Sequence, residues 1–125
     1  MKLHHLALGA RDVEVVARWY GEVFGLPEVS RHHYDDGTLR SVWLQADELV
    51  LMVEHTDESR RVDGVGAGPF LLAFQVDATE RRALEQRLES SGNAIEARTE
   101  HSSYGRDPEG NRVAISSYPM NLDQY

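Results

Sequence analysis

The first half of the chain alternates between strand-like apolar runs and one helical stripe. A short apolar run of strand length opens it at Leu3–Leu8. A helix is predicted between Asp12, whose carboxylate can cap the first turn, and Gly25, which suits the left-handed position after a helix end. Apolar residues at helical spacing form its buried stripe: Val13, Val16, Ala17, Tyr20 and Phe24. Three strands joined by tight turns at Asp36-Gly37 and Ala46-Asp47 follow: Glu28–Tyr34, Thr38–Ala46 and Glu48–His55.

The second half repeats this order after a polar stretch that contains Gly64, Gly66 and Gly68. Phe70–Val76 is apolar enough for a strand. A variant of the capping box then opens a predicted helix, which Ser90–Asn93 closes. The box consists of Asp77 and Glu80, and the apolar residues of the helix are Ala78, Leu84 and Leu88. Three short strands complete this half: Ile95–Thr99, a piece around Ser103-Tyr104, and Arg112–Ser117.

The two halves can be laid over each other, with His5–Leu8 on Leu71–Phe74 and the two helix ends nearly coinciding. We therefore predict an α+β protein with two strand–helix–three-strand units in tandem. Residues 1–125 would form a single domain. Its first unit would cover about 1–56, a linker about 57–68, and the second unit about 69–118.

Composition and charge exclude several classes of function. The chain has 125 residues and a net charge of −8, and its scattered arginines do not form the cationic cluster that holds nucleic acid. It has no cysteine, which removes disulfides, thiolate metal sites and cysteine nucleophiles. The start lacks the apolar stretch of a signal peptide, and no run approaches the length of a membrane span. We expect a soluble, cytoplasmic protein without nucleic acid or membrane partners.

Three motifs then suggest a family. In chain order they are His5-Leu6-Ala7-Leu8 with Asp12, Trp19-Tyr20 before Phe24-Gly25-Leu26, and Asp107-Pro108-Glu109-Gly110-Asn111-Arg112. From His5 to Ser117 the chain resembles the vicinal oxygen chelate superfamily, which includes glyoxalase I, extradiol dioxygenases, and fosfomycin- and bleomycin-resistance proteins. The resemblance implies two βαβββ units whose curved mixed sheets surround a cleft.

In that family the cleft often holds a divalent metal, bound by His, Glu or Gln side chains of the first and last strands of the units. By this resemblance His5 matches the first ligand, whereas Leu71 and Ala114 stand where metal-binding relatives carry His and Glu. A catalytic metal needs about three protein ligands, so we expect no cofactor, with a divalent metal as the alternative. Glu54 is the weak candidate for a partner of His5, and the apolar run Leu49–Val53 leaves open whether it faces the cleft.

Strand alternation predicts which side chains face the cleft. The predicted lining is mainly apolar with a few polar groups: His5, Ala7, Leu71, Ala73, Gln75, Arg112, Ala114 and Ser116. Trp43 and Tyr104 would add stacking surface for a flat or aromatic ligand. The negative charge of the chain would favour a cationic one.

The candidates for catalysis are His5, His101 and Tyr104. The segment that ends at Tyr104 is similar to the stretch before the last hairpin of extradiol dioxygenases, and a histidine there is suited to acid–base chemistry. Alternation places His4 on the opposite side of the first strand from His5. We interpret His32-His33, which leads into a turn, as part of a solvated hairpin.

These observations favour a glyoxalase- or bleomycin-resistance-like protein that binds a small organic molecule at a degenerate metal site. One alternative is a metal-dependent lyase, isomerase or dioxygenase that uses His5, Glu54 and a further ligand. Another is a metal-free enzyme with His5 or His101 as its base, so whether the protein is an enzyme stays open. The open sheet edges predict a homodimer, with contacts through strands and the terminal segment Pro119–Tyr125.

Overall fold

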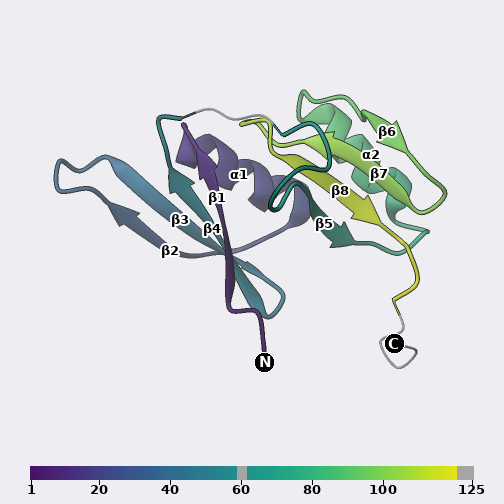
Figure 1. Ribbon diagram of the computed structural model, residues 1–125, viewed down its shortest axis with the longest axis horizontal. Coiled ribbons are helices and arrows are strands. Elements are labelled where there is room, and N and C mark those ends of the chain that lie inside the picture. The colour runs from purple at the N-terminus through teal and green to yellow at the C-terminus, as the bar shows by residue number, and fades with distance from the viewer. Residues whose placement is uncertain (59–61, 121–125) are drawn as a thin grey trace. The chain divides into compact units, whose positions relative to one another are not determined.

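The computed structural model describes residues 1–58 and 62–120 (Figure 1). Its two compact units are Met1–Arg61 with Asp107–Glu109, and Val62–Arg106 with Gly110–Tyr125. Each unit contains one helix and one four-stranded mixed sheet, so the predicted α+β fold of two βαβββ units is confirmed. Within the described residues, no helix combines the length and the apolarity needed to cross a bilayer.

The sheet of the first unit has the strand order β1-β4-β3-β2. β1 (His5–Ala10) runs parallel to β4 (Leu49–His55), while β3 (Leu39–Ala46) pairs antiparallel with both β4 and β2 (Glu28–His33). Gly37 and Asp47 have positive φ angles of 88° and 53° at the two predicted turns. The strands therefore lie within a few residues of their predicted positions.

α1 (Val13–Phe24) packs across β3 and β4 and has the predicted ends. The Asp12 carboxylate accepts a hydrogen bond from the Val15 amide at 3.1 Å, and Gly25 follows the helix with a left-handed φ of 69°. The apolar stripe of the helix meets the buried side of the sheet. The buried apolar residues here are Ala10, Val13, Val16, Ala17, Trp19, Tyr20, Val23, Val42, Leu44, Leu51 and Val53.

The second unit has the strand order β5-β8-β7-β6. β5 (Leu72–Gln75) runs parallel to β8 (Arg112–Ser116), which pairs antiparallel with β7 (Ser102–Arg106). β6 (Ala97–Arg98) is the short edge strand beside β7, and α2 (Arg81–Ser90) packs against β8. Among the described residues of this unit, the buried apolar side chains are Leu88, Val113, Ala114 and Ile115.

The predicted start of the second helix was wrong. Glu80 makes no side-chain cap hydrogen bond, and α2 begins only at Arg81. The backbone carbonyl of Asp77 instead accepts from the amides of Glu80 at 2.9 Å and Arg81 at 3.1 Å, which forms a turn before the helix. Ala78 consequently lies in this turn. The strands after the helix also differ from prediction, because β6 is shorter and β7 longer.

Two arginines supply much of the polar support in the second unit. Arg81 of α2 donates to the hydroxyl of Ser103 and to three backbone carbonyls before and in β7: Thr99, Glu100 and Ser102. Arg106 of β7 is only 7% exposed. It donates to two carbonyls and two carboxylates: Val62, Gly110, Glu96 and Asp63. These hydrogen bonds give the second unit, whose apolar core is small, a connected polar network.

The turn between β7 and β8 belongs to the first unit. Asp107 is 2% exposed, and its carboxylate accepts from the Tyr20 hydroxyl at 2.8 Å and from the Glu109 amide at 2.9 Å. Burial, followed by the charge and hydrogen bond of Asp107, raises the pKa of Tyr20 well above its usual value. Two of the three sequence motifs therefore meet in one buried hydrogen bond.

Candidate functional site

The face of the first sheet that carries His5 is set by strand register. His5, Ala7 and Gly9 are exposed along β1, and Leu6, Leu8 and Ala10 between them are half-buried or buried. The parallel pairing places Glu54 of β4 beside Gly9, on the same face as His5. This face, called the first open face, comprises His5, Ala7, Gly9, Ser41, Trp43, Gln45, Val50, Met52 and Glu54, with Ser30 and His32 of β2 beyond Trp43 and Ser41.

Trp43 lies in a cluster that the sequence did not predict. Its ring centroid is 4.6 Å from that of His32, and its indole N–H donates to the Ser41 hydroxyl at 2.8 Å. The Ser30 hydroxyl lies 2.9 Å from Nε2 of His32. His32 is therefore half-buried, whereas residues 33–36 of the predicted solvated hairpin are exposed. Alternation within Glu28–Tyr34 would have shown that Ser30 and His32 share a face.

His5 has a neighbouring histidine as its hydrogen-bond partner. Nδ1 of His4 and Nδ1 of His5 are 2.9 Å apart, and the two rings meet edge to face at 5.1 Å. Only one of these nitrogens can donate, so the other accepts. The predicted placement of His4 on the opposite side of the strand was wrong, because His4 precedes β1 and lies exposed beside His5.

The register separates His5 from Glu54. His5 pairs with Val50, and Glu54 lies four residues further along β4, a separation of about 13 Å at about 3.3 Å per residue. Side chains stand roughly perpendicular to a sheet, so these two do not converge on one ion. Met52 and Ala7, which lie between them, offer no oxygen or nitrogen ligand. Across the described residues, no three His, Asp or Glu side chains are grouped closely enough to hold a metal ion.

The second sheet gathers most of the other predicted lining residues on one face. Ala73 pairs with Ala114, and Ala114 with Tyr104, so these three lie in a row across β5, β8 and β7. We call this the second open face; it comprises Leu71, Ala73, Gln75, Ser102, Tyr104, Arg106, Arg112, Ala114 and Ser116. The side chains of this face differ in exposure between its edge and its centre. Leu71, just before β5, is 37% exposed, whereas Ala114 at the centre is 1% exposed.

A cation stacked on an aromatic ring dominates the second open face. The guanidinium carbon of Arg112 lies 4.8 Å from the centroid of the Tyr104 ring. Nε of Arg112 is buried without a hydrogen-bond partner. At the other end of β8, the hydroxyl of Ser102 donates to that of Ser116 at 2.7 Å. The face therefore combines the Arg112–Tyr104 pair, the ion-paired Arg106, small apolar side chains and a hydroxyl pair.

Two further histidines, the candidate His101 and His55, have structural partners. His101 precedes β7, and its ring lies edge to face with Tyr118 at 5.3 Å. His55, on the opposite side of β4 from Glu54, has Nδ1 2.9 Å from the Tyr34 hydroxyl and Nε2 3.3 Å from the Asp57 carboxylate. Neither histidine is grouped with a set of metal ligands within the described chain.

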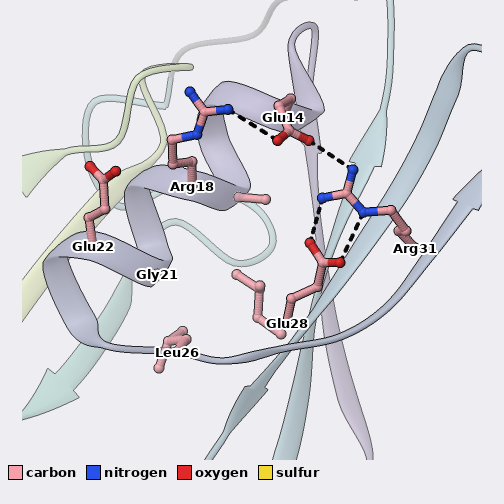
Figure 2. A pocket seen from close by; sticks show the side chains of 9 residues that line it. Glu14, Arg18, Gly21, Glu22, Leu26, Glu28 and Arg31 are labelled. Carbon is pink, nitrogen blue, oxygen red and sulfur yellow. Dashed lines mark hydrogen bonds and ion pairs between the residues drawn. The ribbon is translucent and has the colours of Figure 1, made fainter.

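Figure 2 shows a separate cavity of about 270 Å³ between α1 and the start of β2, which the sequence did not indicate. Ala17, Gly21, Leu26 and Leu44 form its apolar part. At the rim, Glu14 pairs with Arg18 at 3.2 Å and with Arg31 at 3.3 Å. Arg31 also binds Glu28 at 2.6 Å and lowers the pKa of that carboxyl. These four rim charges neutralise one another, whereas Glu22, the other charged residue of the lining, forms no ion pair within the described chain.

Comparisons with known proteins agree with this fold. Residues 2–115 match the model of the Glyoxalase/Bleomycin resistance protein/Dioxygenase superfamily. No curated protein matches the chain with statistical significance.

Solved structures of similar fold cover nearly the whole chain. A mutant of the fosfomycin resistance protein FosX from Listeria monocytogenes, in complex with Mn(II) and dihydroxypropylphosphonic acid, has a TM-score of 0.82 at 16% identity, covering 99% of this chain and 98% of its own. FosX from Mesorhizobium loti has a TM-score of 0.77 at 15% identity, with coverage of 98% and 95%. A lactoylglutathione lyase from Agrobacterium tumefaciens has a TM-score of 0.68 at 25% identity, with coverage of 92% of both chains.

Proposed function

Because the chain belongs to the glyoxalase/bleomycin resistance protein/dioxygenase superfamily, we propose that it binds a small organic molecule on the open faces of its sheets. The observation that carries this proposal is the composition of the second open face. It joins the Arg112–Tyr104 pair, across the buried Ala114, to the exposed Ala73. A mostly apolar surface with a few oriented polar groups is typical of small-molecule sites.

The donor atoms on these faces do not fit the divalent metal that the family implies. A FosX mutant structure contains Mn(II). In this chain, the neighbours of His5 on the first open face are Val50, Ala7 and Met52, and Leu71, Ala73 and Ala114 are the apolar residues of the second. Methyl groups and a thioether are poor ligands for such hard or borderline ions. We therefore propose that binding proceeds without a resident metal and derive no chemistry through one.

A thermal-shift screen of small organic compounds, repeated on two variants, tests this function. A compound that binds only the folded protein raises its Tm. Leu71→Asp places a carboxylate on the second open face and is expected to abolish the shift. Because Leu71 is 37% exposed, the new carboxylate keeps contact with water, and the protein itself should lose little stability.

The second variant separates binding from chemistry. His5→Gln keeps a hydrogen-bonding group at this position, so a binder retains its affinity for the compound. A metal enzyme would lose metal and activity together, and a metal-free enzyme with His5 as base would keep affinity and lose turnover. Unchanged affinity in Leu71→Asp would contradict the proposed binding face.

We also propose that the protein forms a homodimer. β1 and β2 are the edges of one sheet, and β5 and β6 are the edges of the other. Such edges carry backbone groups that a second copy can cover. Of the terminal segment Pro119–Tyr125, which the sequence implicates in this contact, residues 121–125 lie outside the described part of the chain.

A further inference from the structure

We propose that Arg112 selects ligands that carry an oxyanion, such as a carboxylate or sulfonate, beside a flat apolar ring. This inference rests on the proposed function and names the chemical class of molecule that the second open face would take. Arg112 differs in its partners from other arginines of the second unit.

Two of those arginines, Arg98 and Arg106, have carboxylate partners within the protein. Arg106 pairs with Glu96 and Asp63, and Arg98 pairs with Glu85 at 2.5 Å and with Glu89 at 3.2 Å. Arg112 is half-buried, yet no carboxylate of the described chain forms an ion pair with it. Its contact is with the ring of Tyr104, and its Nε–H has no acceptor. A buried guanidinium N–H without an acceptor leaves hydrogen-bonding capacity unused.

The surroundings of Arg112 define the rest of the ligand. The Tyr104 ring lies 4.8 Å from the guanidinium carbon, and a planar guanidinium presents its terminal N–H groups to an oxyanion as a fork. Ala73 lies in the same row as Tyr104, with the buried Ala114 between them, so a flat ring can lie on Ala73 and Leu71, the exposed apolar residues of the face. This local arrangement favours a negatively charged ligand, opposite to the preference that the net charge of −8 predicts. Contacts within the site determine which bound ligand is stabilised, whereas the net charge of the protein mainly affects how a charged ligand approaches it.

Two fluorescent dyes of similar shape test this selection. Anilinonaphthalene sulfonate carries a sulfonate beside its rings, and phenylnaphthylamine is the same framework without the anion. Each is titrated against the full chain and against Arg112→Gln, Arg112→Lys and Arg82→Gln. Arg82 is an exposed residue of α2, so its variant changes the net charge equally without touching the face.

Arg112→Gln is expected to weaken sulfonate dye binding roughly tenfold or more, as the loss of a charged hydrogen bond predicts. Phenylnaphthylamine binding should change less than about twofold, because it has no charge to lose. Arg82→Gln should leave both affinities unchanged. Arg112→Lys, which keeps the charge, should bind the sulfonate dye more tightly than Arg112→Gln; thermal melts of both variants show whether they are folded.

Equal losses for both dyes in Arg112→Gln, or no loss for either, would overturn the selection for an oxyanion. If Leu71→Asp then still abolished binding of both dyes, the proposed binding face would stand without this selectivity. If neither dye bound, or if Leu71→Asp and Arg112→Gln both left the dye affinities unchanged, the proposed face and the selectivity would both be contradicted.

Discussion

At the scale of single residues, Tyr20 and Asp107 form a buried pair whose two halves are far apart in the chain. Tyr20→Phe removes the hydroxyl that donates to the carboxylate at 2.8 Å and leaves Asp107 with the Glu109 amide. We expect a loss of about 1–3 kcal/mol in the free energy of unfolding, the cost of a buried group deprived of a partner. Urea unfolding measures it. Tyr34→Phe, which removes a hydroxyl from an exposed contact, is the matched control and should cost less than about 0.5 kcal/mol.

The same tyrosine makes stability depend on alkaline pH. The folded protein raises the pKa of Tyr20 above the usual value of 10.0. In the unfolded chain the phenol loses its proton from about pH 10 upward, while the folded one keeps it, so the unfolded state gains stability there. The contribution of Tyr20 is complete below that pH and declines as the pH rises through and beyond it.

Urea unfolding of the natural chain and of Tyr20→Phe at a series of pH values from about 8 to about 11 tests this dependence. The stability difference between the two proteins should be constant at the lower pH values and narrow at the higher ones. A difference that stayed constant over the whole range would show that Tyr20 ionises equally in both states.

At the scale of elements, the second unit relies on Arg106 more than on apolar burial. Arg106→Gln removes donors from the carbonyls of Val62 and Gly110 and from two carboxylates. We expect a loss of about 1–3 kcal/mol in unfolding free energy, because the buried Arg106 side chain loses its hydrogen bonds to four partners. Arg11→Gln breaks the ion pair with Glu109, in which Arg11 is 57% exposed, and should cost under about 1 kcal/mol. Similar losses in the two variants would contradict the structural role of Arg106.

Local signals in the sequence predict elements well where the signal is itself the stabilising contact. Asp12 and Gly25 delimit α1 because their cap and left-handed conformations act within one turn. Asp77 failed as a cap because its backbone carbonyl forms a turn with Glu80 and Arg81, a competition that composition does not reveal. β6 has only two residues, fewer than predicted, because it lies at the sheet edge and pairs with only one neighbouring strand.

Strand alternation predicted which residues of the candidate site share a face within one strand, and no more than that. Alternation groups Ala73 with Gln75, and Arg112 with Ala114, along their own strands. It does not give the register between strands, and register decides that Glu54 lies beside Gly9, away from His5. The stacking of Arg112 on Tyr104 likewise depends on the pairing of β7 with β8.

At the scale of the whole molecule, sedimentation equilibrium at micromolar concentration tests the proposed homodimer. We expect twice the mass of the 14.1 kDa chain. The reason is that edge strands β1, β2, β5 and β6 offer unpaired backbone groups for a second copy. A single species of chain mass at every concentration would contradict the dimer.

The metal content of the purified protein tests the central claim, that this superfamily member binds its ligand without a resident metal. Protein prepared without chelator is analysed for manganese, iron, nickel and zinc, beside the His5→Ala variant. Because the neighbours of His5 on the first open face are Val50, Ala7 and Met52, we expect far less than one ion per chain and no difference between the two proteins. Close to one ion per chain, lost in His5→Ala, would contradict the account.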